Sequence, residues 1–216
     1  MTGEHEDDRA GTDTAAIEPD KKLSAELKEW LAGEGERTLG ALVDAFGKKS
    51  FAILFVLLLG VPALPLPTGG ATHVFEVIAA LLALELIVGR RQVWLPRRWH
   101  GLKLGGDRQR RFIAALTGLI RRLERLSRPR LAFLFDHRLS NIVFGLLVLG
   151  GTAGAFFAPP FTGLDTLPSL GVVVLALGVL LEDFLVVAVG LVVGVAGIAL
   201  EIVVGAAALH GLNAIF

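Results

Sequence analysis

The sequence predicts an all-α integral membrane protein, with about five hydrophobic helices in two broken-helix repeats and short amphipathic interfacial helices. Hydrophobic residues make up 53% of the 216 residues and charged residues only 19%, a composition outside the usual range of soluble domains. Long, almost uncharged apolar runs fill residues 51–89 and 141–216, and no soluble core of this size needs them. Proline and glycine interrupt these runs at two corresponding places.

The N-terminal 50 residues carry most of the polar character outside the central segment. Residues 1–22 hold seven acidic side chains and almost nothing apolar, which predicts a disordered acidic tail. This tail has neither the basic start nor the apolar stretch of a secretory signal peptide. Residues 23–50 predict two short amphipathic helices, the first with Leu23 and Leu27 on one face and the second beginning after Thr38, a typical N-cap. The first helix is a candidate for lying on the membrane surface.

Residues 51–89 form the first membrane half. The apolar run from residue 51 to residue 61 spans only about 16 Å as a helix, roughly half of a bilayer core. The stretch PALPLPTGG that follows cannot continue a helix. Either the preceding amphipathic helix lengthens the span, or the Pro-rich stretch lies at depth as a broken or re-entrant element, and we favour the second. A helix then resumes near Thr72 and reaches about Val88.

Residues 90–140 form a basic segment. They hold fourteen of the 21 Lys and Arg residues against three acids, so the positive-inside rule places this segment in the cytoplasm. Residues 111–126 alternate arginines with apolar side chains at helical spacing, which predicts an interfacial helix. Positive-inside anchoring is enough to explain the basic cluster where the chain leaves the membrane. The more specific interpretation is that this cluster binds lipid headgroups. The candidate headgroup residues are Arg90, Arg91, Trp94, Arg97, Arg98 and Trp99.

Residues 141–216 contain no Lys or Arg, which predicts a second membrane half-repeat and a C-terminal helix embedded throughout. We expect helices over 141–157, 167–181 and 184–209, with a break at APPFTG between the first two. Glu182 and Asp183 are expected in a solvated turn.

A shift of 94 positions superposes the two breaks and the apolar runs beside them. Corresponding broken helices in two halves point to a binding site near the bilayer midplane. Alternatively, Pro and Gly simply make two tight turns between spanning hairpins, and the sequence leaves open whether the halves are inverted or parallel. The matched positions are Gly60 with Gly154, Pro65 with Pro159, Thr68 with Thr162, and Gly69 with Gly163.

Acidic residues follow both breaks. Glu76 lies one turn into the helix beginning near Thr72, and Asp165 lies just before the next broken helix; stabilisation by the helix dipole explains both positions simply. His73 and Glu76 are three residues apart, which also favours a proton-responsive pair. Glu201 lies inside an apolar run, either as a functional group or near a membrane edge. The candidate ligand-binding residues are therefore Thr68, Gly69, His73, Glu76, Thr162, Gly163 and Glu201.

Several ordered motifs resemble the ExoD family of exopolysaccharide-synthesis membrane proteins. They are residues 37–42 (RTLGAL), 46–47 (FG), 62–69 (PALPLPTG), 89–91 (GRR), 94–98 (WLPRR), 122–124 (RLE) and 128–130 (RPR). The resemblance covers roughly residues 24–205 and leaves out the acidic tail. It implies a bacterial inner-membrane protein needed for normal exopolysaccharide production, and it supplies no catalytic residues.

The sequence offers no catalytic set and no metal-ligand spacing, so we expect neither an enzyme nor a cofactor. Cysteine is absent, which excludes disulfides, thiolate catalysis and Cys-ligated metal centres. Our leading hypothesis is a protein that binds or moves an anionic lipid such as a polyprenyl-phosphate sugar carrier. The alternative is a non-transporting scaffold or regulator whose amphipathic helices dock exopolysaccharide biosynthesis proteins. We expect no nucleic-acid partner, and the pair Gly190 and Gly194 leaves a homo-oligomer open.

Overall fold

The structure is a bundle of α-helices. The computed structural model describes residues 23–32, 38–64, 72–90, 92–94, 100–101, 117–118, 120–125, 137–158 and 163–213, and within these ranges it contains helices and turns but no extended strand. The helices and their bounds are α1 (Leu23–Ala32), α2 (Leu39–Phe46), the short 3-10 helix η1 (Gly47–Lys49), α3 (Ser50–Leu59), α4 (Thr72–Ile87), α8 (Arg138–Phe157), α9 (Thr166–Leu180) and α10 (Phe184–Asn213).

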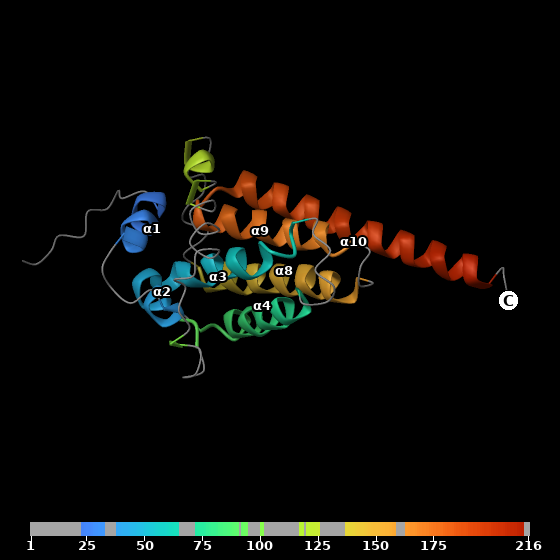
Figure 1. Ribbon diagram of the computed structural model, residues 1–216, viewed down its shortest axis with the longest axis horizontal. Helices are drawn as coiled ribbons and strands as arrows, with labels where there is room; N and C mark the ends of the chain where they lie inside the picture. The colour runs from blue at the N-terminus through green and yellow to red at the C-terminus, as the bar shows by residue number, and fades with distance from the viewer. Residues whose placement is uncertain are drawn as a thin grey trace, which may run out of the picture.

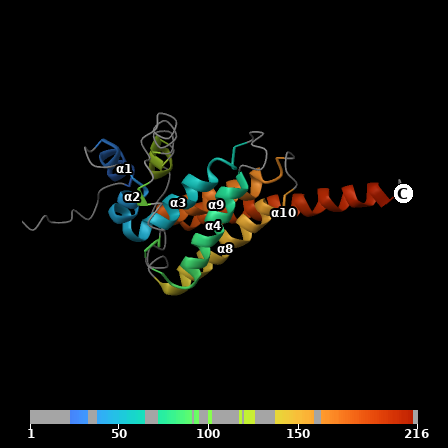
Figure 2. The same ribbon diagram turned by 60° about the horizontal axis from the view of Figure 1, so that its bottom comes forward.

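Five apolar helices make up the body of the bundle. Helix α10 packs along α9, α4 packs along α8, and α3 packs along α9, while α10 extends well beyond the ends of the other helices (Figures 1 and 2). Two of these helices, α8 and α10, are long and apolar enough to cross a membrane. The five helices fall close to the predicted ranges, whereas five complete membrane spans stay a prediction.

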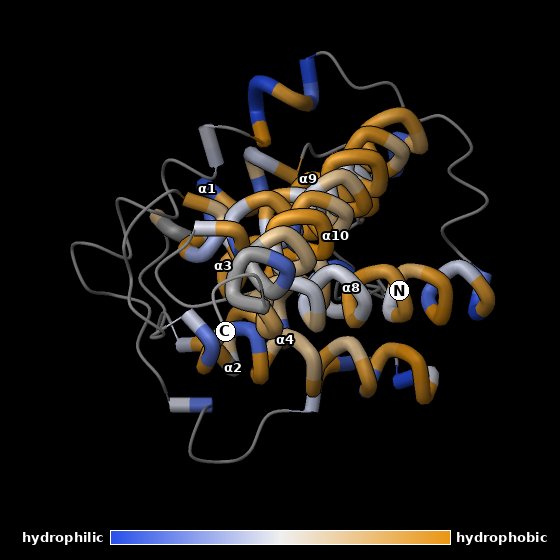
Figure 3. Tube along the Cα trace, turned by 90° about the vertical axis from the view of Figure 1, so that its right-hand side faces the viewer, coloured by the Kyte–Doolittle hydropathy of each residue, from blue (hydrophilic) through white to orange (hydrophobic). Residues whose placement is uncertain are grey.

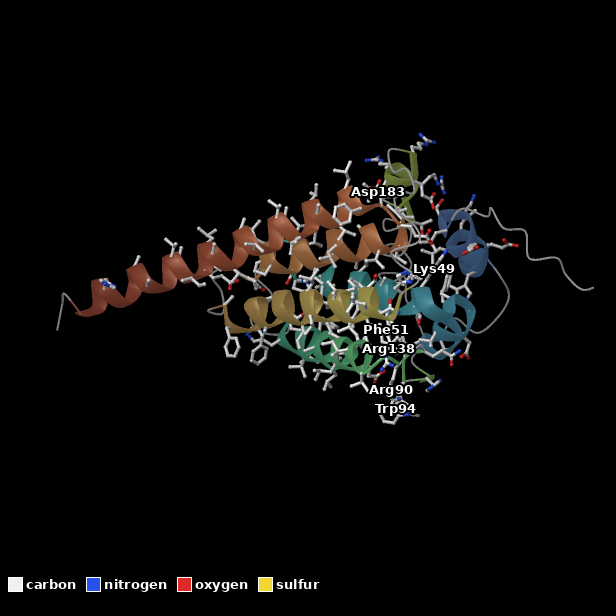
Figure 4. All side chains as sticks on the ribbon, turned by 180° about the vertical axis from the view of Figure 1, so that it is seen from behind. Lys49, Phe51, Arg90, Trp94, Arg138 and Asp183 are labelled. Atoms are coloured by element: carbon white, nitrogen blue, oxygen red, sulfur yellow. The ribbon has the colours of Figure 1, made fainter. Side chains whose placement is uncertain are left out.

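The basic residues at the helix ends gather at one end of the bundle. Lys49, Arg90, Arg138 and Asp183 all lie at the same end of the bundle (Figure 4). These residues mark the start of α3, the end of α4, the start of α8 and the turn between α9 and α10. We call this the basic end. The turns that follow α3 and α8 lie toward the opposite end, which we call the break end, so both hairpins enter and leave on the same side.

Apolar side chains face both the interior and the outside of the bundle. Phe55 is completely buried and makes an edge contact with Phe144, with ring centroids 5.7 Å apart. Outside, hydrophobic residues continue along α9 and α10 (Figure 3). An apolar exterior of this extent is typical of a surface that faces lipid. The exposed apolar residues of α10 include Val189, Val192, Val195, Ile202, Val203 and Val204.

Glycines allow α9 and α10 to approach closely. A methyl group added at Gly190 would lie 2.7 Å from the Cα of Leu175, and one at Gly197 would lie 2.7 Å from the backbone nitrogen of Pro168. A methyl group at Gly171 would overlap the backbone of Gly194. The G-x-x-x-G pair thus packs against α9 of the same chain, in the way small residues do between membrane helices. The homo-oligomer stays a prediction without support from this motif.

The amphipathic helices pack at the basic end. Thr38 is the N-cap of α2, since its hydroxyl accepts a hydrogen bond from the Ala41 amide at 3.2 Å. Leu23 and Leu27 of α1 are buried. Glu124 accepts hydrogen bonds from the Ser24 amide at 2.9 Å and the Ser24 hydroxyl at 2.5 Å. Helix α1 therefore turns its apolar face toward its own chain.

Asp183 corrects one expectation about the turn before α10. It is buried rather than solvated, and its carboxylate accepts a hydrogen bond from the Leu185 amide at 2.9 Å. A side-chain oxygen that caps the first free amides of a long helix explains why an acid is kept there. The neighbouring Glu182 adopts a positive φ of 53°, which closes the tight turn. The predicted acidic tail lies outside the described residues, as does most of the basic segment.

The glycine contact predicts a position-dependent loss of stability on α10. Gly190→Ala should lower the free energy of unfolding by about 1–3 kcal/mol, because the new methyl group forces the two backbones apart. Thermal unfolding of the protein purified in detergent measures this change. Gly205→Ala is the matched control on the same helix, since nothing lies within 4 Å of the added group. Equal melting temperatures for the two variants would contradict the packing.

Candidate functional site

Glu76, which is buried, and His73, which is half-buried, form a pair in the first two turns of α4. Glu76 is 0% exposed, and its Oε2 lies 2.7 Å from His73 Nδ1. The three-residue spacing brings both side chains to one face of the helix, as the sequence indicated. The other oxygen of Glu76, Oε1, is buried and has no hydrogen-bond partner. A buried carboxylate oxygen without a partner is costly, so this position calls for a functional explanation.

The end of α8 supports this pair. The His73 ring packs against the ring of Phe156, with centroids 5.2 Å apart, and Phe156 packs in turn against Phe157. The last turn of α8 therefore holds the imidazole against Glu76. Helix α8 lies along α4, which is why an aromatic side chain about 80 residues later in the chain reaches the start of α4.

Glu201 of α10 approaches the same turn of α8 from another side. A methyl group added at Gly154 would lie 2.7 Å from the Ile198 side chain and 3.8 Å from Glu201 Oε2. Glu201 Oε1 is also buried without a hydrogen-bond partner. The structure thus turns Glu201 toward α8, and its role as a functional group stays a prediction.

Asp165 adds a third acidic group where α9 begins. It interacts electrostatically with both Glu76 and Glu201, which also interact with each other. We call Glu76, Asp165 and Glu201, together with His73, the break-end carboxylate cluster. Its members come from α4, α9 and α10, so the fold gathers groups that are far apart in the sequence.

The carboxylates of this cluster do not form a ready-made metal site. Within the described residues, no three His, Asp or Glu side chains lie close enough together to hold a metal ion. Another buried polar atom without a partner is the hydroxyl oxygen of Ser169, one turn into α9. Sequence analysis did not single out Ser169; a hydroxyl next to Pro168 in an otherwise apolar helix was the available signal.

The remaining predicted ligand-binding residues are only partly placed. Gly163 is exposed and has a positive φ of 70°, a conformation that suits glycine in the turn leading into α9. Thr68, Gly69 and Thr162 lie outside the described residues.

The headgroup candidates lie at the other end of the bundle. The Arg90 guanidinium lies 5.9 Å from the centroid of the Trp94 ring, in a cation–π geometry. The Trp94 amide donates a hydrogen bond of 2.9 Å to Glu85 Oε2, which fixes the chain where it leaves α4. Arg90 and Trp94 are both exposed. The other candidates, Arg91, Arg97, Arg98 and Trp99, lie outside the described residues.

Comparison with known proteins identifies the family. The family model described as "Exopolysaccharide synthesis, ExoD" matches residues 23–203. The chain belongs to the ExoD family. Protein ExoD of Rhizobium meliloti is 30% identical over 154 residues, which cover 71% of this chain and 64% of that protein. The ExoD family is involved in exopolysaccharide synthesis, and this confirms the resemblance seen in the sequence motifs.

A second relative extends over more of the chain. The uncharacterized protein slr1875 of Synechocystis sp. is 30% identical over 177 residues, which cover 81% of this chain and 82% of that protein. No solved structure matches this chain. The region that the ExoD family model matches, residues 23–203, includes all helices from α1 to most of α10. It therefore includes the whole break-end carboxylate cluster.

The buried pair predicts a measurable coupling between His73 and Glu76. His73→Ala should lower the free energy of unfolding by about 1–3 kcal/mol, because it leaves a buried carboxylate without its hydrogen bond. In a Glu76→Gln background the same change should cost less, since the group left behind is then neutral. Thermal unfolding of the two single variants and the double variant measures the difference. Additive losses would show that the pair does not stabilise the fold.

Proposed function

We propose that this protein binds or moves an anionic membrane lipid, such as a polyprenyl-phosphate sugar carrier, in the bacterial inner membrane. It does so as a multi-pass protein whose basic segment, residues 90–140, faces the cytoplasm. The observation that carries the proposal is the mismatch in length between α10 and the helices packed beside it.

The length of α10 can be compared directly with the thickness of a bilayer. Its apolar window, Phe184–Ala207, has 24 residues, or about 36 Å of helix, enough to cross a hydrocarbon core of about 30 Å. Gly197 contacts Pro168 at the start of α9, and this contact lies about 20 Å along α10 from Phe184. A further stretch of apolar α10 continues beyond it. The start of α9 therefore falls inside the depth that α10 crosses.

The first half gives the same result. Helix α3 has only 10 residues, about 15 Å, while α4 has 16 residues, about 24 Å. Both hairpins begin and end at the basic end, so the break that follows the 10-residue α3 falls short of the far side of α10. Non-helical backbone at such depth is tolerated where it is buried in protein or lines a cavity. This arrangement supports the re-entrant interpretation of the first break. Helix α8 has 20 residues and is itself long enough to cross a hydrocarbon core, so the support for the second break is the contact of Gly197 with the start of α9.

The packing also supports two related halves. Helix α4 begins at Thr72 and α9 begins at Thr166, which is the 94-residue shift found in the sequence. In the two halves, α3 corresponds to α8 and α4 corresponds to α9. The contact between α4 and α8 therefore corresponds to the contact between α9 and α3, and both contacts are present. Because both hairpins open at the basic end, the halves have parallel rather than inverted orientation. Within the described residues, no helix of the first half corresponds to α10.

A lipid phosphate would find suitable groups at both ends. At the basic end, Arg90 and Trp94 can engage a headgroup through charge and an interfacial indole. At the break end, α4 and α9 both begin, and helix N-termini favour anions. These positions suit a headgroup that enters from the cytoplasmic surface and is held at depth. No sugar-transfer chemistry is required of the protein, which agrees with the absence of a catalytic set in the sequence.

The scaffold alternative has less support. It needs the apolar faces of the amphipathic helices to be free for a partner, but Leu23 and Leu27 of α1 and Ile120 of the basic segment are buried in their own chain. The remaining large exposed apolar area lies on the long helices, chiefly α10, where lipid accounts for it.

The proposal predicts a loss of lipid binding at the membrane exit. Arg90→Ala combined with Arg91→Ala should weaken binding of a polyprenyl phosphate on the order of 10- to 30-fold, at about 1 kcal/mol for each cation. Native mass spectrometry of the purified protein with added polyprenyl phosphate measures this affinity. Exopolysaccharide output of cells carrying the variant as their sole copy should fall in parallel, at unchanged protein level in the membrane.

Arg121→Ala combined with Arg122→Ala provides the matched control. These arginines are exposed on the helical turn at residues 120–125 and carry the same charge away from the end of α4. Equal weakening by both pairs would show that general positive charge, rather than the exit of α4, attracts the lipid. Unchanged binding in the Arg90 and Arg91 variant would contradict the proposed headgroup site.

A further inference from the structure

We propose that the break-end carboxylate cluster is a proton-binding site. Glu76 and Glu201, held near Asp165, together carry fewer than two negative charges. The site binds and releases protons as part of the protein's work rather than serving only to hold the fold together. It deepens the proposed function, on which its coupling to a lipid rests, but the proton binding itself does not need a lipid.

The first argument is the like charge of the cluster. Three carboxyl groups interact electrostatically within one end of the bundle, and two of them have buried oxygens without a hydrogen-bond partner. Carboxylates that share a poorly solvated site cannot all ionise, because each negative charge opposes the next and burial opposes all of them. At least one carboxyl group therefore carries a proton in part of the physiological range.

Few balancing cations lie near the cluster among the described residues. Helix α4 contributes His73, which already contacts Glu76, and α9 and α10 contribute the acids themselves. Helix α8 turns Gly154, Phe156 and Phe157 toward this end, and α3 carries no ionisable side chain. Neither break sequence, residues 65–71 or 159–162, contains an ionisable residue, and no Lys or Arg follows Arg138. Among the described residues of α4, α9 and α10, His73 is the group in contact with a carboxylate of the cluster; the other imidazole, His210, lies nine residues beyond Glu201 on α10, is exposed and has its Nδ1 2.9 Å from the Ala206 carbonyl oxygen.

The third argument distinguishes a proton from a metal ion. A cation such as Na⁺ or Ca²⁺ needs several oxygen ligands around one point, whereas the described residues contain no group of three acidic or imidazole side chains at that spacing. A proton needs only one oxygen. Glu76 and Glu201 each have a buried Oε1 without a hydrogen-bond partner; His73, the partner of Glu76, packs on Phe156, while Oε2 of Glu201 lies near Gly154, so each carboxyl group has its own surroundings on α8 and can bind a proton separately.

Protonation would control what the break end can hold. Helices α4 and α9 start there, and their N-termini favour an anion. Ionised Glu76 and Asp165 at these same positions repel a lipid phosphate. Binding of a proton removes part of this repulsion, so the proton and the phosphate each favour binding of the other. The cluster would then link entry of an anionic headgroup to uptake of protons.

The test uses dicyclohexylcarbodiimide, an apolar reagent that adds to protonated carboxyl groups in membrane-embedded sites. The full-length protein in detergent, without lipid phosphate, is treated across about pH 5 to 8, and the labelled peptides are quantified by mass spectrometry. We expect label on Glu76 or Glu201 that is present at low pH and declines as the pH rises. Absence of label on both residues throughout this range would overturn the proposal.

Variants test whether the carboxyl groups act together. Glu76→Gln removes one negative charge, so Glu201 should lose its proton more easily and the midpoint of its labelling should move about one pH unit lower. Glu201→Gln should do the same for Glu76, which keeps the test valid if one variant fails to fold. Glu85→Gln, on the same helix but at the basic end, is the control and should leave the midpoint in place. A midpoint pH of labelling that is the same in both cluster variants as in the unchanged protein would contradict a shared site.

Two further conditions separate the possible sources of failure. Addition of Na⁺ at constant ionic strength should not protect the carboxyl groups; protection would replace the proton site with a sodium site. In nanodiscs containing a polyprenyl phosphate, labelling of the cluster should persist to higher pH than in phosphatidylcholine alone. If labelling depends on pH but is the same with and without the polyprenyl phosphate, the proton site is supported and the lipid function is contradicted.

Discussion

The fixed thickness of a bilayer is the constraint on which the arrangement depends. Helix α10 is long enough to cross a hydrocarbon core, while the shorter α9 packs along it and the shorter α3 and α4 join the bundle through α9 and α8. Close packing at Gly171, Gly190 and Gly197 fixes the position of α9 on α10, and thereby fixes the level at which its broken hairpin turns. A bundle of equal helices would place both turns at a surface, and the carboxylates near them would be ordinary solvated side chains.

Charge is distributed along the bundle in a way that fits this depth. Lys49, Arg90 and Arg138 lie at one end (Figure 4), where cations meet headgroups and water. The acidic groups of the break-end carboxylate cluster lie toward the other end, on α4, α9 and α10, which contain two imidazoles, His73 and His210, and no Lys or Arg. A headgroup moving from the basic end to the cluster would pass from attraction to repulsion. Protonation of the cluster is the physical means by which such a step becomes favourable.

Much of the fold could be predicted from the sequence, because apolar runs, Pro breaks and the Thr38 cap are local signals. The helix starts at Thr72 and Thr166 fall within a residue or so of expectation. The approach of His73 and Glu201 to the same part of α8 could not be predicted, since α4 and α10 each pack on α8 from distant segments of the chain. Burial of Asp183 and of Ser169 was missed for the same reason: composition marks them as polar, and only the neighbouring helices decide whether water reaches them.

The most direct test of this account is the depth of the two breaks, and the absence of native cysteine makes it a clean one. Single cysteines at Thr68, Thr162, Leu119 and Phe216 are labelled from each side of the membrane with an impermeant thiol reagent. Leu119, in the basic segment, should react from the cytoplasmic side, and Phe216 reports the end of the chain beyond α10. The account predicts that positions 68 and 162 resist the reagent from both sides, or react from one side only through a polar cavity. Free labelling of both from the outside, as in ordinary surface loops, would contradict it.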